Sequence, residues 1–227
     1  MIPGPRSYAR QSNPAVHQMV DGYAKFHAAL AVIGSLFLIV IIFLGIISWV
    51  KFKKVRKEQG HKWQFEKKTY FFFGSLLTVT ALFLALIVVA NISNAVKPLP
   101  GFSSSISSLE VSNSNTQLRQ GFSDWVTSGD DTPPSVVSES IHDRRVFHGG
   151  RLLLGVLILT VTTLFSIRIW KKLVEQRNSN QTAWSIKEIG YLVLGVFVVI
   201  FALLMVLVIM ANFQSFVVPI ANTLIFG

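Results

Sequence analysis

The chain has 227 residues, of which 51% are hydrophobic and only 14% charged, and its mean hydropathy is +0.52. Soluble domains carry about a quarter charged residues, so this composition argues against a water-soluble enzyme or a disordered chain and predicts a membrane protein. The formal net charge is +10, and there is no cysteine. Disulfides, thiolate nucleophiles, zinc–thiolate sites and iron–sulfur clusters are therefore excluded.

Four apolar segments are long enough to cross a bilayer, since a helix needs about 20 apolar residues to cross the roughly 30 Å hydrocarbon core. They are 26–50, 71–93, 152–170 and 189–213. The first is too long for the apolar region of a secretory signal, and no small-residue cleavage pattern follows it. We therefore predict an all-α membrane protein with four transmembrane helices.

Basic residues gather in two of the connecting loops. The stretch from Lys51 to Lys68 holds eight Lys and Arg in eighteen residues. Loops rich in Lys and Arg stay preferentially in the cytoplasm, so both hairpin loops are expected there and both termini outside it. The second loop contributes Arg168, Lys171, Lys172, Arg177 and Lys187.

The charge of the first loop also suggests a lipid partner. Contact between anionic lipid and Lys51 to Lys68, at about 1 kcal/mol per basic residue near the surface, explains this charge more simply than nucleic-acid binding, which is not expected.

The short loops and the lack of targeting segments favour a location in the plasma membrane, specifically the inner membrane of a bacterium. Four tryptophans flank the two loops, where they are expected to anchor the helices at the headgroup level: Trp49, Trp63, Trp170 and Trp184.

The chain contains an internal duplication. Residues 26–98 align with 147–219 at a constant offset of 121 and without a gap. Coincidence does not readily align tryptophans, a tyrosine, glycines and a proline in this way. Because each copy holds two spans, the prediction is two tandem, parallel helical hairpins related by a pseudo-two-fold axis along the membrane normal. Identical pairs include His27/His148, Trp49/Trp170, Arg56/Arg177, Trp63/Trp184, Tyr70/Tyr191, Asn91/Asn212 and Pro98/Pro219.

The duplication divides the chain into five predicted regions. These are an extracytoplasmic tail (1–25), the first hairpin (26–98), an extracytoplasmic Ser/Asn-rich segment (99–146), the second hairpin (147–219) and an apolar C-terminal tail (220–227). The apolar side chains of 99–146 are too few for an independent core and are expected to pack on the membrane domain or on a partner. The tail is too short to cross again and is expected at the outer interface or against another subunit.

Small residues kept in both copies predict close helix packing. Such residues let helix backbones approach one another in lipid, where packing drives association. The paired positions are Gly34, Gly155, Gly74, Gly195, Ala81 and Ala202.

Two histidines and two asparagines fall at the outer boundary of the predicted hairpins: His27, His148, Asn91 and Asn212. The simplest interpretation is that the histidines bond lipid or loop backbone and the asparagines bond terminal helix carbonyls. A polar contact between the repeats is an alternative. A metal site or bis-histidine haem ligation by His27 and His148 is a third, although no carboxylate lies near to orient the imidazoles, and no cofactor is predicted.

The functional hypothesis follows from what the spans lack. Arg168 is the one charged residue inside them, whereas proton relays and ion pathways ordinarily need such groups. No catalytic constellation is present either, so the chain is predicted not to be an enzyme but a subunit or scaffold of a multi-subunit membrane complex, with other membrane proteins as partners. Two alternatives remain open: a small dimeric transporter or channel along the repeat axis, and a haem-binding electron-transfer subunit. A channel would be lined by Thr78, Thr80, Thr160, Thr162 and Thr163.

Overall fold

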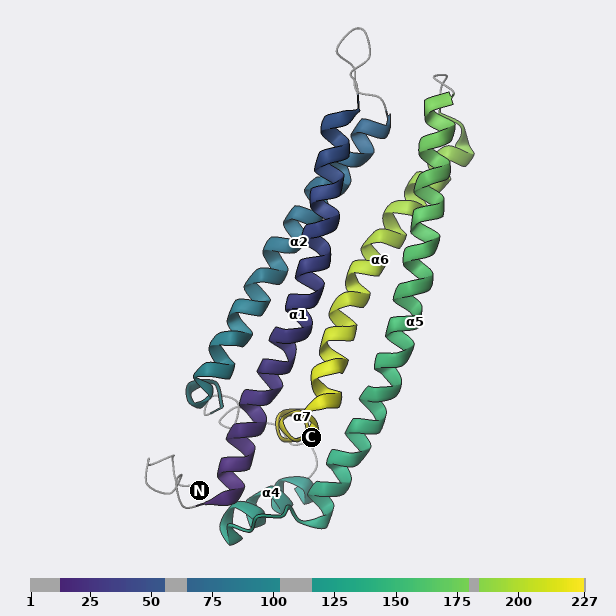
Figure 1. Cartoon of the computed structure of the whole chain (residues 1–227). Coiled ribbons are helices and arrows are strands. Elements are labelled where there is room, and N and C mark those ends of the chain that lie inside the picture. The colour runs from purple at the N-terminus through teal and green to yellow at the C-terminus, as the bar shows by residue number, and fades with distance from the viewer. Residues whose placement is uncertain (1–12, 56–64, 103–115, 180–183, 227) are drawn as a thin grey trace. The chain divides into compact units, whose positions relative to one another are not determined.

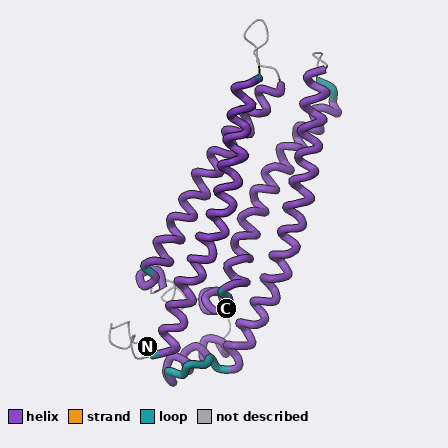
Figure 2. The backbone as a smooth tube through the Cα atoms, in the orientation of Figure 1, coloured by secondary structure: helices purple, strands orange, loops and turns teal. Residues whose placement is uncertain are grey.

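The computed structural model describes residues 13–55, 65–102, 116–179 and 184–226, and all regular structure in these ranges is helical (Figures 1 and 2). The all-α prediction is therefore confirmed. The helices are α1 (Pro14–Lys54), α2 (Phe65–Val96), α4 (Thr116–Ser128), α5 (Ser135–Ser179), α6 (Ile186–Val217) and α7 (Pro219–Phe226).

Four of these helices, α1, α2, α5 and α6, are long and apolar enough to cross a membrane, as expected of a multi-pass membrane protein. They extend beyond the predicted spans. α1 has 41 residues, which at 1.5 Å per residue is about 60 Å, roughly twice the hydrocarbon thickness. Its early start has a local cause, because the Asn13 side chain accepts a hydrogen bond from the Val16 amide at 3.2 Å and caps the helix ahead of Pro14.

The chain divides into two compact units, and α1, α2, α5 and α6 each contribute residues to both. The terminal unit comprises Met1–Ile33, Val88–Leu152 and Met210–Gly227. The span unit comprises Gly34–Ile87 and Leu153–Ile209. Exposed large hydrophobic side chains are frequent along the long helices of the span unit, which is the pattern of surfaces that face lipid.

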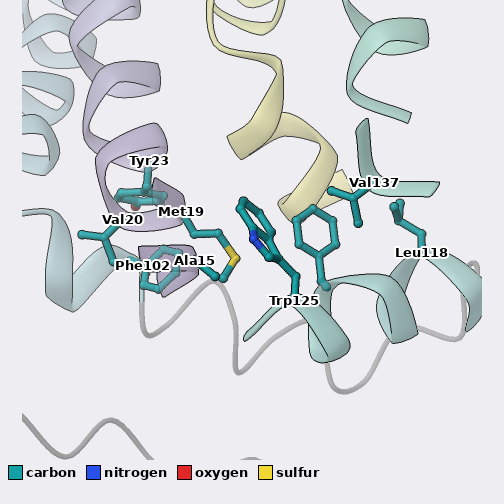
Figure 3. Packing of buried hydrophobic residues seen from close by; sticks show 9 residues of the cluster. Ala15, Met19, Val20, Tyr23, Phe102, Leu118, Trp125 and Val137 are labelled. Carbon is teal, nitrogen blue, oxygen red and sulfur yellow. The ribbon is translucent and has the colours of Figure 1, made fainter. Parts of the chain in front are cut away.

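The terminal unit contains a small apolar core (Figure 3). Trp125 of α4 lies at its centre, fully buried, and its indole N–H donates to the Asp130 carbonyl at 2.8 Å. α4 ends at Ser128, and Gly129 directly after it has a φ of 71°, the left-handed conformation that closes many helices. The buried members are Ala15, Met19, Val20, Tyr23, Phe102, Leu118, Phe122, Trp125 and Val137.

This core changes the interpretation of segment 99–146. Its apolar residues Leu118, Phe122 and Trp125 belong to one buried cluster with residues from the start of α1, and so contribute to a core that the segment alone was too small to build. Three further apolar residues of this segment, Ile106, Leu109 and Val111, lie outside the described residues.

The C-terminal tail also packs on the chain itself. α6 ends at Val217 and α7 begins at Pro219, since proline cannot continue the hydrogen-bond pattern of α6. Ala221 and Thr223 are each 1% exposed, and Ile220 packs against the apolar core. A Cβ added to Gly22 of α1 would lie 2.6 Å from Ile220 Cγ2, so the two helices are in close contact. The chain itself therefore covers Ala221 and Thr223, among the side chains of α7 that the structure describes.

The loop-side ends of the two hairpins are held differently. Lys67 is 7% exposed, and its ammonium group donates to the Val55 carbonyl at 2.8 Å just after α1 ends. At the start of α6, Ser185 and Glu188 form a reciprocal capping box, and the Glu188 carboxylate lies 3.7 Å from the Arg177 guanidinium.

Candidate functional site

The first candidate site is a histidine–asparagine pair in the terminal unit. His27 Nδ1 of α1 lies 2.6 Å from Asn91 Oδ1 of α2. Because an amide oxygen only accepts, Nδ1–H is the donor. Asn91 is 8% exposed, and the imidazole packs edge-on against the Tyr23 and Phe26 rings. The pair therefore joins α1 to α2 by a largely buried hydrogen bond.

The second hairpin has the same contact. His148 Nδ1 of α5 lies 2.9 Å from Asn212 Oδ1 of α6, and the two residues of each pair are 64 positions apart in both hairpins. Asn212 is also 8% exposed. These hydrogen bonds join α1 to α2 and α5 to α6, so each runs within one hairpin and not between the repeats.

Two tryptophans predicted to be membrane anchors pack against glycines of the neighbouring helix. The Trp49 ring contacts Gly74, where an added Cβ would lie 2.9 Å from Cε2, and its indole N–H donates to Thr78 Oγ1 at 3.2 Å. Trp170 covers Gly195 in the same way, at 3.1 Å, and donates to its carbonyl at 3.3 Å. At Gly74 and Gly195, the absence of a side chain therefore leaves the space that the indole ring of the neighbouring helix occupies.

The remaining predicted positions have varied surroundings. Gly34 and Gly155 are buried, and a Cβ on Gly155 would lie 3.1 Å from Ile209. Ala81 and Ala202 are half-buried. Trp184 is 37% exposed, with the Arg177 guanidinium 4.7 Å from its ring centre. Trp63 and most of the basic stretch after Val55 lie outside the described residues.

Hydroxyl groups along the spans bond to their own helices. Each donates to the backbone carbonyl four positions earlier, a common arrangement for Ser and Thr in helices. A hydroxyl that donates to its own helix has no donor left for a solute. The side chains are Ser48, Thr78, Thr80, Thr160 and Thr162.

Comparison with known proteins adds no functional assignment. No family model, curated protein or solved structure matches the chain. Within the described ranges, no group of three or more His, Asp or Glu residues could hold a metal ion.

A double-mutant cycle tests the two His–Asn pairs. We expect a coupling of about 1 kcal/mol between His27→Ala and Asn91→Ala, and a similar value for His148→Ala with Asn212→Ala, since polar contacts between membrane helices average about 0.6 and reach about 1.7 kcal/mol. The measurement is unfolding by SDS titration of the protein in mild detergent. His27→Ala with Asn212→Ala is the control and should be additive. Equal coupling in the control would contradict pairing within each hairpin.

Proposed function

We propose that this chain is a non-catalytic integral membrane subunit or scaffold of a multi-subunit membrane complex. The observation that carries the proposal is that polar side chains of the long helices form hydrogen bonds within their own hairpin. His27 bonds Asn91, Trp49 bonds Thr78, and Trp170 bonds the Gly195 carbonyl. Hydrogen bonds of this kind hold membrane helices together. A side chain that makes one is directed toward the neighbouring helix and not toward a substrate or a solute pathway.

The proposal includes two tandem, parallel hairpins related by a pseudo-two-fold axis along the membrane normal. Recurring contacts support this arrangement, because the His–Asn and the Trp–Gly contact both recur at the offset of 121 that aligns the two sequence copies. A contact kept in both copies is one that each hairpin needs for its own packing. The duplication then builds a scaffold from two similar rigid parts.

The proposed location is the plasma membrane of a bacterium, with both hairpin loops in the cytoplasm and both termini outside. The basic residues from Lys51 to Lys68 support this orientation. Anionic lipid at the cytoplasmic surface is the expected contact of this stretch.

The test is quantitative co-purification. The tagged chain, expressed at its natural level, is extracted from its source membrane in mild detergent, and the bound proteins are counted by mass spectrometry. We expect other membrane proteins at a fixed molar ratio that persists through size-exclusion chromatography. An unrelated tagged four-helix membrane protein serves as the control. A chain that elutes without partners, or that transports a solute when reconstituted alone in liposomes, would contradict the subunit function and favour the dimeric transporter or channel.

One observation favours a second candidate function, haem-based electron transfer. With Nδ1–H donating to an asparagine oxygen, the neutral His27 and His148 imidazoles carry their lone pair on Nε2, and ligating histidines commonly donate their other ring N–H in this way. The test is an absorption spectrum of protein purified from haem-replete cells. A Soret band that His27→Ala and His148→Ala abolish would support this function, and colourless protein would exclude it.

A further inference from the structure

A lysine and a tyrosine meet at the loop-side end of each hairpin, within the span unit. The Lys51 ammonium lies 5.5 Å from the centre of the Tyr70 ring, and the Lys172 ammonium lies 5.0 Å from the centre of the Tyr191 ring. An aromatic ring attracts a cation within about 6 Å. The offset of 121 that aligns the two sequence copies takes Lys51 to Lys172 and Tyr70 to Tyr191. Both hairpins therefore make the same contact, and we call the two sets the Lys–Tyr pairs.

The Lys–Tyr pairs lie where the predicted spans meet the headgroup region. In the first hairpin, Lys51 directly follows the span 26–50 and Tyr70 directly precedes the span 71–93. Tyrosine favours this depth, because its ring is apolar and its hydroxyl is polar. Both lysines are exposed, and both tyrosines are half-buried. A lipid headgroup at this level can therefore reach the ammonium groups.

Neither lysine of the pairs has a carboxylate partner among the residues that the structure describes. The neighbouring Lys171 forms an ion pair with Glu175 at 4.0 Å. The ion pairs recorded for the described chain include neither Lys51 nor Lys172. The positive charge of each pair is thus available to an anion from outside the chain.

Neither the helix dipole nor topology accounts for both lysines. Lys51 lies in the last turn of α1, where the negative end of a helix favours a cation. α5, in contrast, continues to Ser179, about two turns beyond Lys172, and the dipole acts only within the last turn. A charge that sets orientation needs only to be in the loop, and it does not have to lie over a tyrosine ring in both hairpins.

The pair in the second hairpin shows which groups are offered to an anion. Lys172 Nζ lies 3.3 Å from Tyr191 Oη, and the phenol oxygen is the acceptor, because an ammonium group only donates. The phenol O–H and the other N–H groups of Lys172 remain as donors. Several donors beside one positive charge suit the oxygens of a phosphate group, for which lysine is a common ligand.

We propose that each Lys–Tyr pair binds the phosphate group of an anionic phospholipid in the cytoplasmic leaflet. The lysine supplies the charge, and the tyrosine supplies a hydroxyl donor at the edge of the hydrocarbon. The inference rests on the lipid contact of the proposed function, and it narrows that contact from a basic stretch to one lysine in each hairpin. It also adds Lys172, which lies outside that stretch. Free inorganic phosphate has the same chemistry, and the experiment separates the two sources.

The test counts the lipids bound to the purified full chain by native mass spectrometry. The chain in mild detergent is titrated with phosphatidylglycerol and, separately, with phosphatidylcholine. We expect one phosphatidylglycerol for each pair, bound at least about fivefold more tightly than phosphatidylcholine. The double variant Lys51→Gln/Lys172→Gln should lose this preference. The double variant Lys51→Arg/Lys172→Arg should keep it, since a guanidinium also binds phosphate.

The matched control is Lys53→Gln/Lys171→Gln, which removes the same charge from exposed lysines near the pairs and should keep the preference. Equal loss in the two glutamine variants would show that binding follows net charge alone, and would overturn the proposal. Displacement of the bound lipid by millimolar inorganic phosphate would overturn the assignment to lipid and favour the free ion.

A second comparison tests the hydroxyl groups. Tyr70→Phe/Tyr191→Phe keeps both rings and removes both donors, so we expect phosphatidylglycerol to bind about two- to tenfold more weakly. Unchanged binding would contradict the role given to the tyrosines. Both measurements count lipids on the chain alone, so their failure is distinct from loss of the partner proteins in the co-purification experiment.

Discussion

Replacing Trp125 by alanine is expected to unfold the apolar core of the terminal unit. The side chain is fully buried, and its indole N–H donates to the Asp130 carbonyl. Removing a buried Trp or Phe side chain typically costs about 3–5 kcal/mol, from lost transfer free energy and the cavity left behind. Amide hydrogen exchange should show α4 losing its protection, whereas the amides of the span unit keep theirs.

Two further variants of α4 give this experiment its controls. Gln120→Ala changes an exposed residue of the same helix and should alter the free energy of opening by no more than about 0.5 kcal/mol. Trp125→Phe keeps most of the apolar volume but loses the hydrogen bond, at a cost of about 1 kcal/mol. If α4 in Trp125→Ala exchanges as slowly as in Gln120→Ala, the core does not hold this helix in place.

Gly74→Leu is expected to separate α1 from α2, and Gly195→Leu should do the same to α5 and α6. An added Cβ at Gly74 would lie 2.9 Å from the Trp49 ring, and one at Gly195 would lie 3.1 Å from the Trp170 ring. A leucine needs still more space, so the indole must leave its position. Overpacking of this kind costs about 1–3 kcal/mol, and we expect the upper end because both indoles also lose their hydrogen bonds. SDS titration in mild detergent measures the loss.

Gly150→Leu is the matched control for this pair of variants. It makes the same chemical change in a helix but meets open space, so helix propensity alone should make it neutral or up to about 1 kcal/mol more stable. Trp fluorescence reports directly on the packing, because the Trp49 and Trp170 rings become more solvated when displaced. Equal stability of Gly74→Leu and Gly150→Leu would show that the indole does not depend on the glycine.

The candidate site could be predicted only in part. The recurrence of His27 and His148, and of Asn91 and Asn212, singled out residues that the structure joins in hydrogen-bonded pairs, because a repeated polar side chain in an apolar helix has few neutral roles. Their partners were not identified, since sequence spacing alone does not tell which faces of two antiparallel helices meet. The tryptophans show the same limit: an anchor at the membrane interface and a ring packed on a glycine have the same sequence context, yet Trp170 is 7% exposed.

The sequence by itself determined the helical class and the four long apolar helices, because a chain in lipid must satisfy its backbone hydrogen bonds within each helix, a local requirement. The tertiary structure decided which side chains meet. It placed α4 and α7 in one core with the start of α1, although these segments are far apart in the chain. It also brought Phe72 of α2 against Trp170 of α5. Such choices depend on the packing of surfaces distant in sequence, for which the local sequence carries no signal.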